Sequence, residues 1–270
     1  MRTSSRFVPF LLVGTTLAAC TGTNELRDLD SDSVGEIMLN FADPGESVKY
    51  FSSALAQKPG DIDAKRNMAA ALARADRYEE AAGYYSEVTA SGTATPRDRL
   101  TYADALLRTG NWKAAEQQLA KVPNSLRSYE RFRLAAIIAD IRHDWAAADK
   151  HYQQARSLTV QPAAILNNWG VSKLSRGAYA EAEAKFREAV SFDRELFAAK
   201  NNLVIARGRQ RNYQLPILPM TETERAQLLH DLAVVALENG DTDVAKQLLR
   251  EALDAHPQHF EAAAVKLAGF

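Results

Sequence analysis

The sequence predicts an all-α protein built as an array of repeated helix pairs. Aromatic residues recur at a nearly constant spacing, since Tyr78, Trp112, Trp145 and Tyr179 are separated by 34, 33 and 34 positions. An alanine stands three positions after each of them, and a large apolar residue follows four positions later. A fixed period of this length indicates stacked repeats, each of which buries its apolar stripe against its neighbours.

Each repeat is expected to contain two helices joined by a tight turn. Gly110, Gly177 and Gly240 fall two positions before the aromatic position or its equivalent. A glycine at such a place lets the backbone adopt the conformation that ends one helix sharply. In the second helix, apolar residues such as Ala182 and Phe186 follow at helical spacing, which predicts a single buried stripe.

The period is interrupted after residue 196. The first helix of this unit is present, but Pro216 and Pro219 forbid a regular second helix. Thr221 and Glu224 then have the spacing of a capping box, which predicts that a helix restarts there. The apolar side chains between Tyr213 and Thr221 either plug the gap between neighbouring units or stay exposed as a partner patch, and we favour the plug. These apolar residues are Leu215, Ile217, Leu218 and Met220.

The last helical pattern is expected to cover the exposed end of the array, as solenoids require. The predicted organisation is a weak unit at 34–61, units at 62–95, 96–128, 129–162 and 163–196, a broken unit at 197–225, a unit at 226–259 and a closing helix at 258–269.

The repeats resemble the tetratricopeptide repeat (TPR), whose pattern combines W-x2-L-G-x2-Y, A-x3-F and a closing proline. The unit at 163–196 carries Trp169 and Gly170 in this pattern, although Trp169 stands where leucine is usual. Arg194 replaces the closing proline, which the last unit retains as Pro257. The resemblance implies a helical solenoid that binds other proteins through the first helices of its units.

The start of the chain resembles a bacterial lipoprotein signal. Arg2 and Arg6 precede an apolar run, 7–19, that is shorter than the roughly 20 residues needed to span a bilayer. The run ends in Leu-Ala-Ala followed by Cys20, which is the only cysteine in the chain. The resemblance to the lipobox implies that Cys20 is lipidated and that 1–19 is removed. The alternative is a plain secretory signal with an incidental cysteine, which would leave a lone thiol free to pair wrongly.

The polar, acid-rich segment 20–33 is expected to be a flexible tether between the lipid and the array. Thr21 follows the cysteine, where an aspartate would resemble the inner-membrane retention signal. The expected location is therefore the outer membrane, with the protein lipid-anchored on the periplasmic side.

Neither the composition nor the motifs indicate catalysis. The formal net charge of −1 gives no basic footprint for nucleic acid. No P-loop, nucleophile elbow or dinucleotide-binding turn is found in the sequence. His256 and His259 with Glu261 are the one cluster of ligand-like residue types, and we interpret it as a surface turn. We therefore expect no enzymatic activity, no catalytic residue, no metal and no cofactor.

The TPR resemblance places the inner, concave face on the first helix of each unit. Arginine and asparagine on this face could hold an extended peptide through its carbonyls or carboxylates, and the alternative is an ordinary solvated face. The candidate peptide-binding residues are Arg66, Arg74, Arg108, Arg133, Asn167, Asn201 and Arg209. Asn167 and Asn201 are favoured because amides bind peptide backbone. The same expected face also includes Leu100, Asp104, Ile137, Asp140 and Val171.

A narrower resemblance is to the TadD-type lipoproteins of Flp (tight adherence) pilus assembly. It rests on the lipobox, the repeats and the segments NNWGVSKLSRGAYAEAEAKFREA, QLPILPMTETERAQLLHDLAVVAL and DAHPQHFEAA. It implies a scaffold that assists assembly of the pilus secretion apparatus, with the secretin as client. The alternatives are a periplasmic chaperone-like or outer-membrane protein assembly lipoprotein with other clients, and a repeat-bearing peptidase, which would need a further domain. The oligomeric state is left open.

Overall fold

The computed structural model describes residues 31–270, so Cys20, the expected signal peptide and most of the expected tether lie outside the described residues. The described part contains 14 α-helices and no strand, which confirms the predicted all-α fold class. The helices are α1 (Ser31–Asn40), α2 (Pro44–Gln57), α3 (Ile62–Arg74), α4 (Tyr78–Ala90), α5 (Pro96–Arg108), α6 (Trp112–Ala120), α7 (Tyr129–Ile141), α8 (Trp145–Arg156), α9 (Ala163–Ser175), α10 (Tyr179–Phe192), α11 (Phe197–Arg209), α12 (Glu222–Glu238), α13 (Thr242–Ala255) and α14 (Glu261–Ala268).

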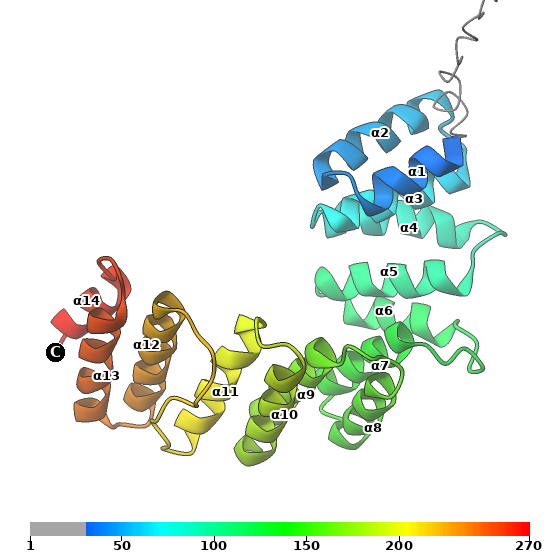
Figure 1. Ribbon diagram of the computed structural model, residues 1–270. Coiled ribbons are helices and arrows are strands. Elements are labelled where there is room, and N and C mark those ends of the chain that lie inside the picture. Colours follow the sequence, from blue (N-terminus) through cyan, green and yellow to red (C-terminus); the bar gives the residue numbers. More distant parts are fainter. Residues whose placement is uncertain (1–30) are drawn as a thin grey trace, which may run out of the picture.

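The helices form consecutive hairpins that stack into a curved array (Figure 1). Each hairpin contacts the next along the chain, and the first helices of neighbouring units also contact one another, as α5 contacts α7 and α9 contacts α11. At the N-terminal end, α1 begins at Ser31, three residues before the expected start of the array at residue 34. The closing helix α14 packs on α13 at the other end.

In the part of the chain that the structure describes, the turns that follow six of the first helices each contain a residue with a positive φ angle. Five of these turns join a helix pair, and the sixth follows α11, which has no second helix. Three of these turn residues are the predicted glycines, with φ between 77° and 83°, and the other three are not glycine, with φ between 56° and 58°. An L-residue with a side chain pays a steric cost in this region, whereas glycine does not. The six turn residues are Asp76, Gly110, His143, Gly177, Arg211 and Gly240.

The interior is built from alanines and glycines against large side chains. Ala182 and Phe186 are both fully buried in α10. Gly170 of α9 faces Phe186, and a Cβ atom at this glycine would lie 2.4 Å from the Phe186 ring carbon Cε1. Because no such contact is tolerated, the glycine lets the two helices approach closely enough to bury the ring.

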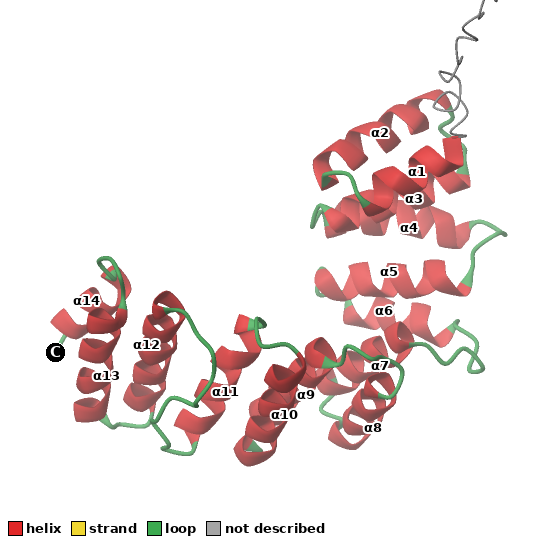
Figure 2. Cartoon of the chain, in the orientation of Figure 1, coloured by secondary structure: helices red, strands yellow, loops and turns green. Residues whose placement is uncertain are grey.

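The broken unit consists of α11 followed by a loop in place of a second helix (Figure 2). The predicted capping box is present, since Thr221 and Glu224 bond reciprocally where α12 begins. That helix starts at Glu222, four residues before the expected boundary at 226. A helix of 13 residues spans about 20 Å, and roughly six extended residues span the same distance. The loop is therefore long enough to make the return passage that a second helix makes in the other units.

The apolar side chains of this loop act largely as a plug. Leu215 and Met220 pack against the core of α12 and α13, and Leu218 packs against two clusters formed by α9, α10 and α11. Ile217 is fully exposed to solvent. The plug prediction is therefore correct for three of the four residues and wrong for Ile217. Leu215 and Leu218, before and after it in the loop, pack inward, and the Ile217 side chain between them points to solvent.

The loop is also tied to the next hairpin through the turns. An ion pair of 2.5 Å joins Arg211 to Asp241, and the Tyr213 hydroxyl donates to the same carboxylate. The Asn239 side-chain amide donates to the Gly208 carbonyl at 2.7 Å and to the Tyr213 hydroxyl at 2.8 Å. The array therefore continues past the missing helix without losing its link between units.

Candidate protein-binding face

The first helices line the inner side of the curved array (Figure 1). Helix α7 shows how one helix separates the two faces. Arg133 and Ile137 lie one turn apart on one side, while Ala135 and Ala139 lie on the opposite side and line a pocket beside α6 and α8. In α7, the candidate residue Arg133 therefore lies on one face of the helix. The surface that packs beside the second helices α6 and α8 lies on the opposite face.

A hollow of about 550 Å³ lies on the inner face between α5 and α7. Asp104 and Arg133 both line it, and they form an ion pair of 2.7 Å across the two helices. The residues around the hollow are Arg97, Leu100, Thr101, Asp104, Glu130, Arg133 and Leu134. The Arg133 guanidinium predicted to meet a client is thus already paired with a carboxylate of the neighbouring unit.

Arg66 is engaged in the same way. Its guanidinium donates to both oxygens of Asp98, at 2.7 and 3.1 Å, and the Asp98 side chain is only 3% exposed. Burial would raise the pKa of Asp98, but hydrogen bonds from Arg66 and Thr95 outweigh burial, and the pKa is lowered overall. The hydrogen bond with Asp98 in turn raises the pKa of Arg66. This pair fastens α3 to α5, and its polar groups are satisfied inside the protein.

The other three candidate arginines also have partners in the fold. Arg74 donates to the carbonyls of Met38 and Ala42, at 3.1 and 2.9 Å, which fixes the first hairpin onto α3. The Arg108 guanidinium lies 5.2 Å from the centre of the Tyr78 ring. Arg209 forms an ion pair of 2.5 Å with Glu238.

The two favoured asparagines lie on α9 and α11, which contact each other. The side-chain oxygen of Asn167 accepts a hydrogen bond of 2.9 Å from Asn202. The side-chain oxygen of Asn201 is buried and has no hydrogen-bond partner among the described residues. Asn167 thus contributes to the contact between units, and a role for either asparagine in binding a peptide remains a prediction.

A polar junction holds α7 to α9. The carboxylate of Asp140 accepts hydrogen bonds from the Ser172 hydroxyl at 2.6 Å and from the Tyr152 hydroxyl at 2.7 Å. Burial raises the pKa of Asp140 despite these two bonds, and burial together with the nearby Asp140 carboxylate raises that of Tyr152. Asp140 therefore serves as an acceptor within the fold.

Aliphatic residues repeat on the inner face of the C-terminal first helices. In α7, α9, α11 and α12 the position six residues before the turn residue is always a β-branched aliphatic side chain. Val171 is 43% exposed, and the others are half-buried. We name this set the aliphatic row, and its members are Ile137, Val171, Ile205 and Val234. Ile205 and Val234 were missed from the sequence, although counting back from Arg211 and Gly240 would have found them.

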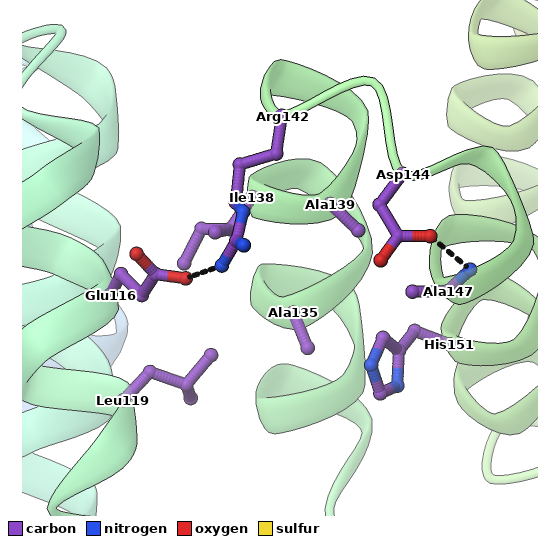
Figure 3. Close-up of a pocket in the computed structure, with 9 residues that line it drawn as sticks. All are labelled: Glu116, Leu119, Ala135, Ile138, Ala139, Arg142, Asp144, Ala147 and His151. Carbon is purple, nitrogen blue, oxygen red and sulfur yellow. Dashed lines mark hydrogen bonds and ion pairs between the residues drawn. The ribbon is translucent and has the colours of Figure 1, made fainter.

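A second hollow, of about 200 Å³, opens on the opposite face of α7, between α6 and α8 (Figure 3). Ala135 and Ala139 form its floor, and His151 projects from α8. Across the opening Glu116 and Arg142 form an ion pair of 2.6 Å. The charged side chains at the rim of this hollow pair with each other, and its apolar floor is small.

Among residues 31–270 no group of three or more histidine, cysteine, aspartate or glutamate side chains could hold a metal ion. In the same range, no helix is long and apolar enough to cross a membrane.

Comparisons with known proteins agree with this geometry. A family model described as "Tetratricopeptide repeat" matches residues 39–98 and 230–266. A search of curated proteins found no match to the chain. The fold of residues 31–270 is an all-helical TPR array. This fold typically serves protein–protein interaction and is typically non-catalytic.

Several solved structures share the fold. The APC/C assembly Cut9–Hcn1 matches with a TM-score of 0.61 at 15% identity, over 88% of this chain and 47% of the other, so this chain spans about half of that relative's length. A tetratricopeptide repeat protein from Parabacteroides merdae matches with a TM-score of 0.56 at 12% identity, over 87% and 95%. The C-terminal part of a TPR protein from Cytophaga hutchinsonii matches with a TM-score of 0.54 at 13% identity, over 86% and 97%.

Proposed function

We propose that this protein is a lipid-anchored scaffold at the periplasmic side of the outer membrane that assists assembly of the Flp pilus secretion apparatus, with the secretin as its client. The observation that carries the scaffold role is the curved array (Figure 1), whose inner face carries the aliphatic row with Val171 exposed and the other three members half-buried. The resemblance of the segment 167–189 and of the broken unit to TadD-type lipoproteins supports the pilus system as the setting.

The lipid anchor supports this role through local concentration. Lipidation of Cys20 would hold the array close to the inner surface of the outer membrane, where a secretin must assemble. A tethered binding site acts at a high effective concentration, so a modest affinity for the client is sufficient. Two or more acyl chains anchor a protein stably, whereas one chain gives only marginal binding.

A deletion strain tests the proposal. We expect loss of surface pili by electron microscopy and fewer assembled secretin multimers by immunoblot, with both restored by the wild-type gene. Cys20→Ser should abolish labelling by palmitate and give a weaker form of the same defect. Normal multimers and normal pili in the deletion strain would exclude the pilus role and leave a chaperone-like or assembly lipoprotein with other clients as the alternative.

A further inference from the structure

The aliphatic row leaves part of its apolar surface in solvent. Val171 keeps 43% of its surface in solvent, and Ile137, Ile205 and Val234 are half-buried at the equivalent position of their own helices. Apolar side chains that remain exposed at one place on several neighbouring elements typically mark a contact surface.

The row is continuous because its four helices are fastened to one another. The Ser172 hydroxyl joins α9 to Asp140 of α7, and the Asn202 amide joins α11 to Asn167 of α9. The buried Lys200 reaches Glu224 of α12 at 3.1 Å. Each row residue therefore has a fixed neighbour on the next helix.

Most polar groups that border the row are already paired, and the exception is the buried side-chain oxygen of Asn201, one turn before Ile205, which has no hydrogen-bond partner among the described residues. Asp140 accepts two hydroxyl hydrogen bonds, the Asn167 oxygen accepts the Asn202 amide, and Arg209 is paired with Glu238. An extended peptide would bring unpaired backbone N–H and C=O groups to this face, and burying them without partners is costly. A helix satisfies its own backbone hydrogen bonds, and it needs from this face only apolar contact.

The spacing also suits a helix. Packed neighbouring helices lie about 8–10 Å apart. In an α-helix the rise of 1.5 Å per residue places residues seven positions apart at about 10.5 Å. A partner helix that lies along the row can therefore place every seventh side chain against successive row residues. These side chains all lie on one face of the partner helix.

We propose that the aliphatic row binds an amphipathic α-helix of a partner protein, with aliphatic residues at every seventh position against Ile137, Val171, Ile205 and Val234. This inference rests on the proposed scaffold role and deepens it by giving the chemistry of the partner segment. It does not depend on the pilus system.

The test uses full-length protein and a fluorescent synthetic helical peptide of about 22 residues, with leucine at every seventh and neighbouring fourth position and Glu or Lys elsewhere. Fluorescence anisotropy measures its binding. We expect Val171→Asp to weaken binding at least tenfold. The matched control is Val160→Asp, at a valine that is 92% exposed in the loop after α8 and outside the row, and it should bind like the wild type. Val171→Ala, which disturbs the fold least, should weaken binding by a smaller factor.

Four outcomes would overturn the inference. They are absence of peptide binding to the wild type, equal binding by Val171→Asp, equal binding of a peptide of the same composition with a central proline, and wild-type dimers that Val171→Asp converts to monomers. The proline result would indicate an extended occupant, and the last result a second copy of this chain. Loss of pili in the deletion strain is measured separately, so failure of the pilus proposal would leave this test unaffected.

Discussion

The inner faces of the two halves of the array are built from different chemistry on the same helical frame. Six residues before the turn, α3 and α5 carry Ala70 and Asp104, whereas the four C-terminal first helices carry the aliphatic row. The arginine pairs that fasten α3 to α5 and α5 to α7 fill the N-terminal inner face. The repeat period thus fixes the packing and leaves the inner face free to differ along the array, so different units can have structural and binding roles.

The largest effect is expected at the pair that fastens the N-terminal units. Asp98→Ala removes the charged hydrogen bonds of Arg66 and the capping box of α5, and we expect a loss of about 2–3 kcal/mol of unfolding free energy. Val171→Ala, at the exposed member of the aliphatic row, should cost about 0.5 kcal/mol. Urea denaturation followed by circular dichroism measures both. Equal losses would contradict the structural and binding roles assigned to the two halves.

The same pair should make stability sensitive to acid. Because the folded-state pKa of Asp98 is lowered, its contribution to stability is present above the unfolded value of about 4 and is lost as the pH falls through the folded pKa. The Tm of the wild type should therefore fall more between pH 6 and pH 3 than that of Asp98→Asn. An equal fall in both proteins would show that Asp98 is not held ionised by Arg66.

The loop of the broken unit should contribute to stability through its buried side only. Leu218→Ser should destabilise the protein by about 1–2 kcal/mol, because that leucine packs on the α9–α11 clusters. Ile217→Ser, one position earlier and fully exposed, should change stability by less than about 0.5 kcal/mol. Rapid selective proteolysis of the folded wild type after Leu218 would show instead that the plug is not formed.

The smallest effects are expected at the turns, which both halves share. Gly177→Ala should cost about 1 kcal/mol because the turn holds φ at 78°. His143→Gly should stabilise the protein by up to about 1 kcal/mol, since His143 adopts φ of 57° at the equivalent place. Thermal unfolding compares the two changes, and a destabilised His143→Gly would indicate that the His143 ring, 5.0 Å from that of Trp145, outweighs the backbone term.

The fold was predictable because its signals are local. The spacing of Tyr78 and the later aromatic residues predicts the units, and Gly110, Gly177 and Gly240 lie at turns as predicted. The restart at Thr221 followed from a capping box that spans only four residues. Asp76, His143 and Arg211 were not predicted as turn residues, because their side chains give no sign of a positive φ; only their place in the period does.

The candidate face was predictable only as a set of positions. The sequence places Arg66 and Arg133 on the inner side, but the carboxylates that engage them, Asp98 and Asp104, are 32 and 29 positions away on a neighbouring unit. No local pattern reveals such a pairing, which depends on how successive hairpins stack. For the same reason Ile137 and Val171 could be listed from the sequence without showing that, together with Ile205 and Val234, they form a row.

The most direct test of the central claim compares one residue from each inner face. Binding of the amphipathic peptide is measured for Val171→Asp and for Arg108→Ala, whose guanidinium lies 5.2 Å from the centre of the Tyr78 ring in the N-terminal half. We predict at least tenfold weaker binding for Val171→Asp and a change of less than about twofold for Arg108→Ala. Loss of binding in Arg108→Ala with unchanged binding in Val171→Asp would contradict the claim that the aliphatic row of the C-terminal half binds the partner.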